Sequence, residues 1–179
     1  MGMSSYDWPI EFRKVYDAGT ERYQRGERIP AKLFSKKELE FLASIGCSAQ
    51  ELFDFIDDNA RYGEPDYETT VLTTAVRRDY FMVELDGAPS TKQISMGDLP
   101  SKKEAVDGIE WLPRLIEKAR AKLRGEMPAD LMYGCGGDRP FLRSMNVELA
   151  EFLHVVWRAG NDNRKIIDYV KKRRSQMVD

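Results

Sequence analysis

Apolar residues recur every three to four positions along most of the chain, which is the spacing of an amphipathic helix. In the first half this spacing predicts helices that begin before Phe12, after Ser35, after Ser48 and at Asp66. Ser35 and Ser48 are each followed three residues later by a glutamate, which is typical of a capping box at a helix start. The first half is therefore predicted to consist of helices.

The second half has the same spacing and similar helix-start and helix-end residues. A helix is predicted from about Trp111 to Gly125, with a proline in its first turn. Asp138 with Pro140 just inside is typical of another helix start. Asn146 is expected to cap the next helix, and Asn161 or Asp162 the last one.

Residues 86–107 interrupt the helical pattern. Gly87, Pro89, Gly97 and Pro100 occur there in a polar stretch, which indicates a connector. The sequence leaves one alternative open nearby, a short β hairpin with strands around 81–85 and 91–95. Helix and hairpin cannot be distinguished there from the residues alone.

The two halves share residues in the same order, about one hundred positions apart. Arg-Gly-Glu and Pro-Ala-x-Leu occur in 25–34 and again in 124–132. Phe, Leu, Ser and Glu are identical between 41–56 and 141–156. Helical periodicity explains the matching apolar positions, but it does not explain the shared polar residues, which favour an internal duplication.

These patterns predict an all-α fold of two related helical units packed into one compact bundle. The predicted first unit spans 1–85, the connector 86–107 and the second unit 108–179. A short β hairpin in the connector is allowed. A homodimer is also possible, because exchange between two chains satisfies the same pattern.

Composition excludes several classes of function. Lys and Arg number 28 against 30 for Asp and Glu, so the net charge of −2 gives no broad attraction to nucleic acid. No apolar run approaches the roughly 20 residues that span a bilayer, and no signal peptide is evident, so a cytoplasmic protein without a membrane partner is predicted. Two cysteines and one histidine do not make a zinc cluster. No metal and no cofactor are predicted.

The stretch 133–140, Tyr-Gly-Cys-Gly-Gly-Asp-Arg-Pro, is the best site candidate. The first half makes the same connection with 35–40, which contains neither glycine nor cysteine. Cys135 lies just before a helix start, where the helix dipole favours a thiolate. Asp138 or Arg139 would then position a substrate. The simpler interpretation is a half-buried loop cysteine in a turn that needs glycines.

A wider ligand-binding set follows from the same stretch and from aromatic and basic residues near it. Its members are Tyr133, Cys135, Gly136, Gly137, Asp138, Arg139, Trp111 and Arg114. The basic residues of 111–125 are interpreted as a solvated helix face, and they are Arg114, Lys118, Arg120, Lys122 and Arg124. Cys47 is predicted to be buried, and the single histidine, His154, to lie on the surface.

The segment 111–123, Trp-Leu-Pro-Arg-Leu-Ile-Glu-Lys-Ala-Arg-Ala-Lys-Leu, is followed by Tyr133, Cys135, Asp138 and the pair Phe141-Leu142. This arrangement resembles a bacterial family catalogued as domain of unknown function 5069. The resemblance is confined to the second half of the chain, because the corresponding part of the first half reads differently. It implies no activity, cofactor or partner.

Three functions are compatible with these observations. The favoured one is a non-enzymatic small-ligand or protein-binding helical module with its site near 133–139, because no complete catalytic set is present. The alternative is a cysteine-dependent enzyme or redox protein that uses Cys135, which requires a base or a cation beside the thiol. A weaker alternative is a nucleic-acid accessory protein that uses the basic helix and the basic C-terminal residues.

Overall fold

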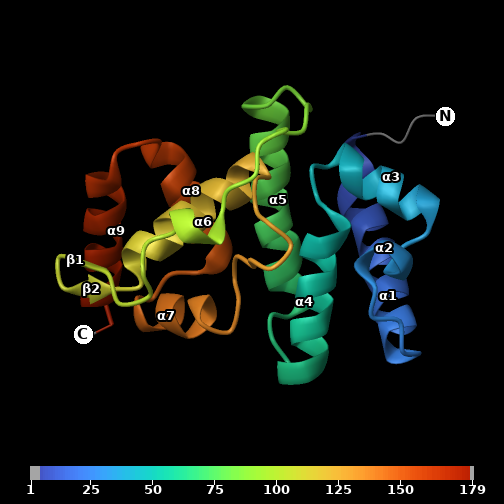
Figure 1. Cartoon of the computed structure of the whole chain (residues 1–179), viewed down its shortest axis with the longest axis horizontal. Coiled ribbons are helices and arrows are strands. Elements are labelled where there is room, and N and C mark those ends of the chain that lie inside the picture. The colour runs from blue at the N-terminus through green and yellow to red at the C-terminus, as the bar shows by residue number, and fades with distance from the viewer. Residues whose placement is uncertain (1–4, 178–179) are drawn as a thin grey trace. The chain divides into compact units, whose positions relative to one another are not determined.

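A computed structural model of the chain describes residues 5–177, which form nine α-helices, two short 3-10 turns and one two-stranded hairpin (Figure 1). The chain folds as two compact units, and the division falls between Ala88 and Pro89. The predicted mostly helical fold with a small hairpin is confirmed. The duplication and the three-segment boundaries stay predictions.

The first unit consists of helices only. Its elements are a 3-10 turn Ser5–Asp7, α1 Trp8–Gln24, α2 Pro30–Leu33, α3 Lys36–Ser44, α4 Ala49–Tyr62 and α5 Tyr67–Val83. Helix α1 packs against α4, and α2 packs against both. The core includes Phe12, Leu33, Leu42, Leu52 and Ile56. Cys47 lies in the same core, so its predicted burial is confirmed.

Three predicted helix starts of the first unit are confirmed by the hydrogen bonds of their caps. Ser35 and Ser48 both form capping boxes, each with the glutamate three residues later. Asp66 accepts a hydrogen bond from the Thr69 backbone N–H at 2.8 Å. Each cap satisfies a backbone donor that a helix start leaves unpaired.

The second unit contains the hairpin and four helices. Its elements are a 3-10 turn Met96–Asp98, β1 Ala105–Val106, β2 Ile109–Glu110, α6 Leu112–Arg124, α7 Asp138–Ser144, α8 Leu149–Ala159 and α9 Asn163–Ser175. Helix α8 packs against both α6 and α9, and β1 contacts α6. Helix α6 thus contacts both α8 and the hairpin.

The hairpin does not lie where the sequence alternative placed it. Helix α5 continues to Val83, and the stretch 91–95 forms no strand. The strands are 105–106 and 109–110, joined by Asp107 and Gly108, whose φ angles are 51° and 75°. Asp-Gly is a favoured pair for a two-residue hairpin turn because both positions need positive φ. This pair was the signal that the sequence interpretation missed.

The polar residues 89–100 are attached to the second unit by hydrogen bonds. The Ile94 backbone N–H donates to the Glu126 carbonyl at 2.9 Å, and the Ser90 hydroxyl donates to the Glu126 carboxylate at 2.9 Å. Arg114 of α6 donates to the Pro100 carbonyl at 2.8 Å. The predicted connector is therefore tied to α6 and to the residues just after it.

One predicted cap is wrong. Asn146 does not cap α8; the N-cap is Glu148, which forms a capping box with Glu151. Asn146 instead adopts the left-handed conformation, with φ 56°, just after α7 ends. Asparagine adopts the left-handed conformation more readily than most residues. Asn146 therefore terminates α7 and does not begin α8. Asp162 caps α9, as predicted.

The two units share local hydrogen bonds at positions one hundred residues apart. The Ser44 hydroxyl donates to the Phe41 carbonyl at 2.6 Å, and the Ser144 hydroxyl donates to the Phe141 carbonyl at the same distance. The backbone N–H groups of residues 47 and 147 donate to the carbonyls of 42 and 142, both at 3.0 Å. These parallels support the predicted duplication.

Candidate functional site

A buried lysine connects the two polar groups of the glycine-rich segment. Lys118 of α6 donates from its ammonium group to Asp138 Oδ2 at 2.5 Å and to Cys135 Sγ at 3.4 Å. The Lys118 and Asp138 side chains are 3% and 0% exposed. Cys135 is a free, half-buried thiol. The thiol therefore lies beside a cation that is held by a carboxylate.

Asp138 binds donors from three parts of the second unit. Its Oδ1 accepts from the Trp111 indole N–H at 2.9 Å, and its Oδ2 accepts from the Gly134 backbone N–H at 2.9 Å as well as from Lys118. Helix α7 begins at Asp138, as predicted, but the side chain turns inward and does not cap the helix. Because charged acceptors form the stronger hydrogen bonds, this carboxylate fixes the position of Lys118.

Arg139 and Tyr133 hold the loop in place through hydrogen bonds to backbone carbonyls. The buried Arg139 guanidinium donates to the Gly134 carbonyl at 2.7 Å, and the Arg139 backbone N–H donates to the Cys135 carbonyl at 3.1 Å. The Tyr133 hydroxyl donates to the Leu149 carbonyl at 2.7 Å. Burial, with a smaller contribution from the Asp138 charge, raises the pKa of Tyr133 well above its ordinary value. Cys135 is thus presented by a loop whose ends are fixed.

The basic residues of α6 do not form the solvated face that the sequence favoured. Arg114, Lys118 and Lys122 follow one another at four-residue spacing, and all three are buried. Two of them reach acceptors supplied by other segments, the Pro100 carbonyl and Asp138. A row of charges at helical spacing indicates a solvated face only when no such acceptors lie opposite, and a single sequence does not show them.

Lys118 is the residue of the candidate site that the sequence interpretation missed. A signal was present, because Lys118, Cys135 and Asp138 all belong to the pattern on which the resemblance of the second half rests. His154, the other candidate partner of the thiol, is exposed and stacks on Trp157 with 6.3 Å between the ring centroids. Its predicted surface position is confirmed. The ionisable side chain that contacts Cys135 Sγ is Lys118.

The structure brings most of the predicted ligand-binding set together. Trp111 donates directly to Asp138, and Asp138 and Arg139 are linked through Gly134. Cys135 is linked to Asp138 through Lys118. Arg114 is engaged elsewhere, at the Pro100 carbonyl. The polar atoms of these side chains mostly bind one another or the backbone, and their role toward a ligand stays a prediction.

Two further observations apply to residues 5–177. Within that range, no group of three or more His, Cys, Asp or Glu side chains is placed to hold a metal ion. None of the helices in the same range is both long enough and apolar enough to cross a membrane.

Comparison with known proteins gives one match. The family model described as Domain of unknown function (DUF5069) matches residues 97–178. The resemblance predicted for the second half of the chain is thereby confirmed. No curated protein matches the chain, and no solved structure matches it. The matched range contains Lys118, Cys135 and Asp138.

Proposed function

We propose that the second unit is a redox-active thiol protein in which Cys135 is the reacting group. The observation that carries this proposal is the 3.4 Å contact between Lys118 Nζ and Cys135 Sγ. A cation beside a thiol favours the thiolate, which is the form that acts as a nucleophile. This contact is the feature that the cysteine-dependent alternative required.

Asp138 is a positioning residue in this proposal. Its carboxylate holds the Lys118 ammonium group at a fixed place, so the cation does not have to be ordered when the thiolate forms. Its negative charge also partly neutralises Lys118. The buried Arg139 of α7 adds a second cation to the candidate site, so Lys118, Asp138 and Arg139 together carry one net positive charge. A Cys135 thiolate would bring that sum to zero.

The proposed reaction is the reduction of a hydroperoxide. The Cys135 thiolate attacks one peroxide oxygen, the O–O bond breaks, and the products with hydrogen peroxide are a sulfenic acid and hydroxide. A first thiol from solution then forms a mixed disulfide and releases water. A second thiol restores Cys135 and leaves as the oxidised disulfide. The reducing thiols are supplied from solution because Cys47, the other cysteine, is buried in the first unit.

Acyl transfer is the less favoured chemistry for the same thiol. It needs a group that takes a proton from the nucleophile and gives it to the leaving group. Lys118, the side chain in contact with the sulfur, is already bound to a carboxylate. Reaction with a peroxide needs instead a donor for the departing oxygen near the sulfur, and the Lys118 ammonium group lies 3.4 Å from Cys135 Sγ. Two free cysteines fit a reducing compartment, and a cytoplasmic location belongs to the proposal.

The first test compares alkylation of Cys135 by iodoacetamide at pH 7 in three proteins. They are the unaltered chain, Cys135→Ser, and the double variant Lys118→Gln with Asp138→Asn, in which both charges are replaced by amides of similar shape. We expect the double variant to react about tenfold more slowly. This ratio corresponds to a fraction of the Coulomb energy between a Lys118 ammonium and a Cys135 thiolate 3.4 Å apart. Circular dichroism checks that each protein is folded.

The second test follows oxidation directly. After treatment with hydrogen peroxide, trapping by dimedone and intact mass measurement should show one adduct in the unaltered protein and none in Cys135→Ser. Equal alkylation rates in the unaltered protein and the folded double variant would contradict the proposal. So would a protein that forms no adduct at Cys135.

The binding role near 133–139 is the second candidate function. What supports it is the assembly of Trp111, Asp138 and Arg139 around one loop. The redox role is preferred because the polar atoms of these side chains already bind partners within the unit. Cys135, by contrast, retains partial exposure.

A further inference from the structure

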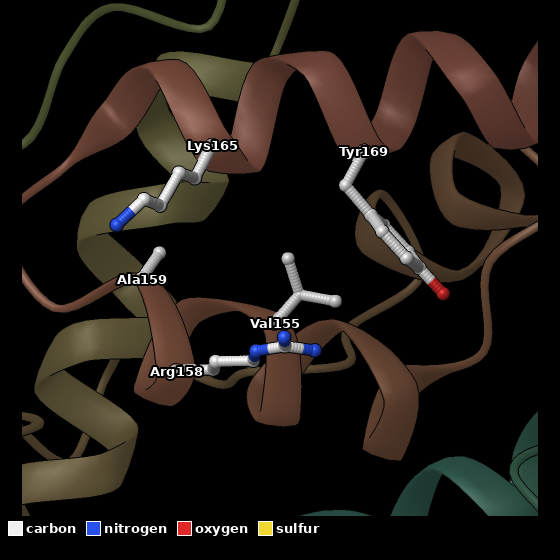
Figure 2. A pocket seen from close by; sticks show the side chains of 5 residues that line it. All are labelled: Val155, Arg158, Ala159, Lys165 and Tyr169. Atoms are coloured by element: carbon white, nitrogen blue, oxygen red, sulfur yellow. The ribbon is translucent and has the colours of Figure 1, made fainter.

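A pocket lies between α8 and α9. Its volume is about 310 Å³, and it is lined by Val155, Arg158, Ala159, Lys165 and Tyr169 (Figure 2). Val155, Arg158 and Ala159 come from α8, whereas Lys165 and Tyr169 come from α9. The whole pocket therefore belongs to the second unit, and its walls are two helices that pack against each other.

The pocket has an apolar part and a cationic part. Val155 and Ala159 lie on the α8 side, and the Tyr169 ring extends from α9 toward α8 (Figure 2). The Tyr169 hydroxyl donates to Glu151 Oε1, which fixes the ring at one end of the pocket. This apolar part can cover a flat hydrocarbon body, while Tyr169 offers an aromatic face to pack against.

Arg158 and Lys165 supply the charge. Arg158 is exposed and makes no hydrogen bond or ion pair with any residue in the range 5–177. Lys165 has only an exposed ion pair with Asp162, at 3.5 Å. No carboxylate is among the residues that line the pocket. Both cations are thus available to an acidic group, and an arginine fork matches a carboxylate particularly well.

We propose that this pocket binds a small aromatic carboxylate. The ring would lie on Val155, Ala159 and Tyr169, and the carboxylate would bind Arg158 with Lys165 beside it. The volume is near the lower end for small-molecule sites, which suits a ligand with one ring. Because none of these residues contacts Cys135, the proposal stands independently of the redox function.

The test is an NMR titration of the full chain with benzoate as the probe. Benzoate should shift the backbone signals of residues 155–169 in a saturable way. Benzamide and benzyl alcohol have the same ring without the charge, and we expect them to bind at least fivefold more weakly. Rising salt should weaken the binding of benzoate and leave that of benzyl alcohol unchanged.

Variants assign the two parts of the pocket. Arg158→Gln should weaken benzoate binding by about fivefold to tenfold, as expected for loss of a charge-assisted hydrogen bond at a partly exposed site. Arg174→Gln is the matched control, because Arg174 is an exposed arginine at the far end of α9 and the change in charge is the same. Ala159→Leu fills the apolar part and should weaken benzoate and benzyl alcohol alike.

Three results would overturn the proposal. One is a benzoate titration without saturation at residues 155–169, and another is equal binding of benzamide. The third is an Arg158→Gln variant that binds as tightly as Arg174→Gln. Since Arg158→Gln leaves Lys118, Cys135 and Asp138 in place, Cys135 alkylation in this variant separates a failure here from a failure of the redox proposal.

Discussion

The indole ring of Trp111 lies directly against the backbone of Gly137. A Cβ atom added at Gly137 would be 2.6 Å from Trp111 Cζ2, closer than real side chains approach. Trp111 itself has φ 71°, a left-handed conformation that is rare for a bulky residue. The glycine therefore allows the strained tryptophan to reach Asp138 with its indole N–H. At this position the glycine-rich stretch serves the site and is more than a turn.

The two adjacent glycines allow a matched comparison. Gly137→Ala should destabilise the protein by about 1–3 kcal/mol, because the ring of Trp111 has to move. Gly136→Ala should change stability by less than about 0.5 kcal/mol, since the nearest atom to its added Cβ is an Arg139 nitrogen at 4.0 Å. Chemical denaturation followed by tryptophan fluorescence measures both. Equal effects of the two variants would show that Trp111 does not depend on Gly137.

Asp138→Ala should be among the most destabilising changes in the second unit. It leaves the buried Lys118 ammonium without its carboxylate and removes the acceptor of Trp111. Breaking one side of a buried ion pair costs about 3–5 kcal/mol. The double variant Lys118→Met with Asp138→Ala should be more stable than Asp138→Ala alone, because no unpaired charge remains. Urea denaturation of the two proteins tests this order, and a less stable double variant would contradict it.

How far the sequence predicts this site becomes clear when Lys118 and Asp138 are compared with the first unit. Counting from the matched Phe41 and Phe141, Glu38 corresponds to Asp138. Glu38 accepts from the Ser35 backbone N–H, as the predicted capping box requires, and also binds the Arg22 guanidinium. Asp138 binds a cation in a similar way, but from inside the unit. The helix starts at Ser35 and Ser48 were predictable, because each depends on two residues three positions apart.

The inward contacts of the site were not predictable from local pattern. The Lys118 to Asp138 contact joins residues 20 positions apart, and its existence depends on how α6 packs beneath the loop. Charge spacing along one helix carries no information about that packing, so Lys118 was interpreted as part of a solvated face. Cys135, whose neighbours in sequence are unusual, was found because its signal is local.

Glu126 should make the second unit sensitive to acid. Burial would raise the pKa of Glu126, but hydrogen bonds from Arg124 and Ser90 offset this effect, and the pKa lies below its ordinary value. A carboxylate with a lowered pKa in the folded state stabilises the fold above its unfolded pKa, about 4.3, and this contribution is lost as pH falls through the folded value.

The measurement is hydrogen exchange of the Ile94 amide, which donates to the Glu126 carbonyl. Its protection should fall below about pH 4 in the unaltered protein. Glu126→Gln should show lower protection at neutral pH and little further loss on acidification, because the titrating group is gone. Protection of Ile94 that falls equally with acid in both proteins would assign the acid sensitivity to another carboxylate.

Tyr133 should limit stability on the alkaline side. The pKa of this phenol is raised by burial and by Asp138, so the folded protein keeps the Tyr133 proton at pH values where the unfolded chain releases it. Above about pH 10 the unfolded state therefore binds fewer protons, and the free energy of unfolding decreases as pH rises. In Tyr133→Phe this part of the decrease should be absent, although loss of the hydrogen bond to the Leu149 carbonyl lowers stability at neutral pH. Absorbance at the tyrosinate band measures ionisation, while circular dichroism reports unfolding. The number of phenols that ionise before unfolding should be the same in the unaltered protein and in Tyr133→Phe, because Tyr133 does not ionise while the protein is folded. Ionisation of all phenols in the folded, unaltered protein would contradict this.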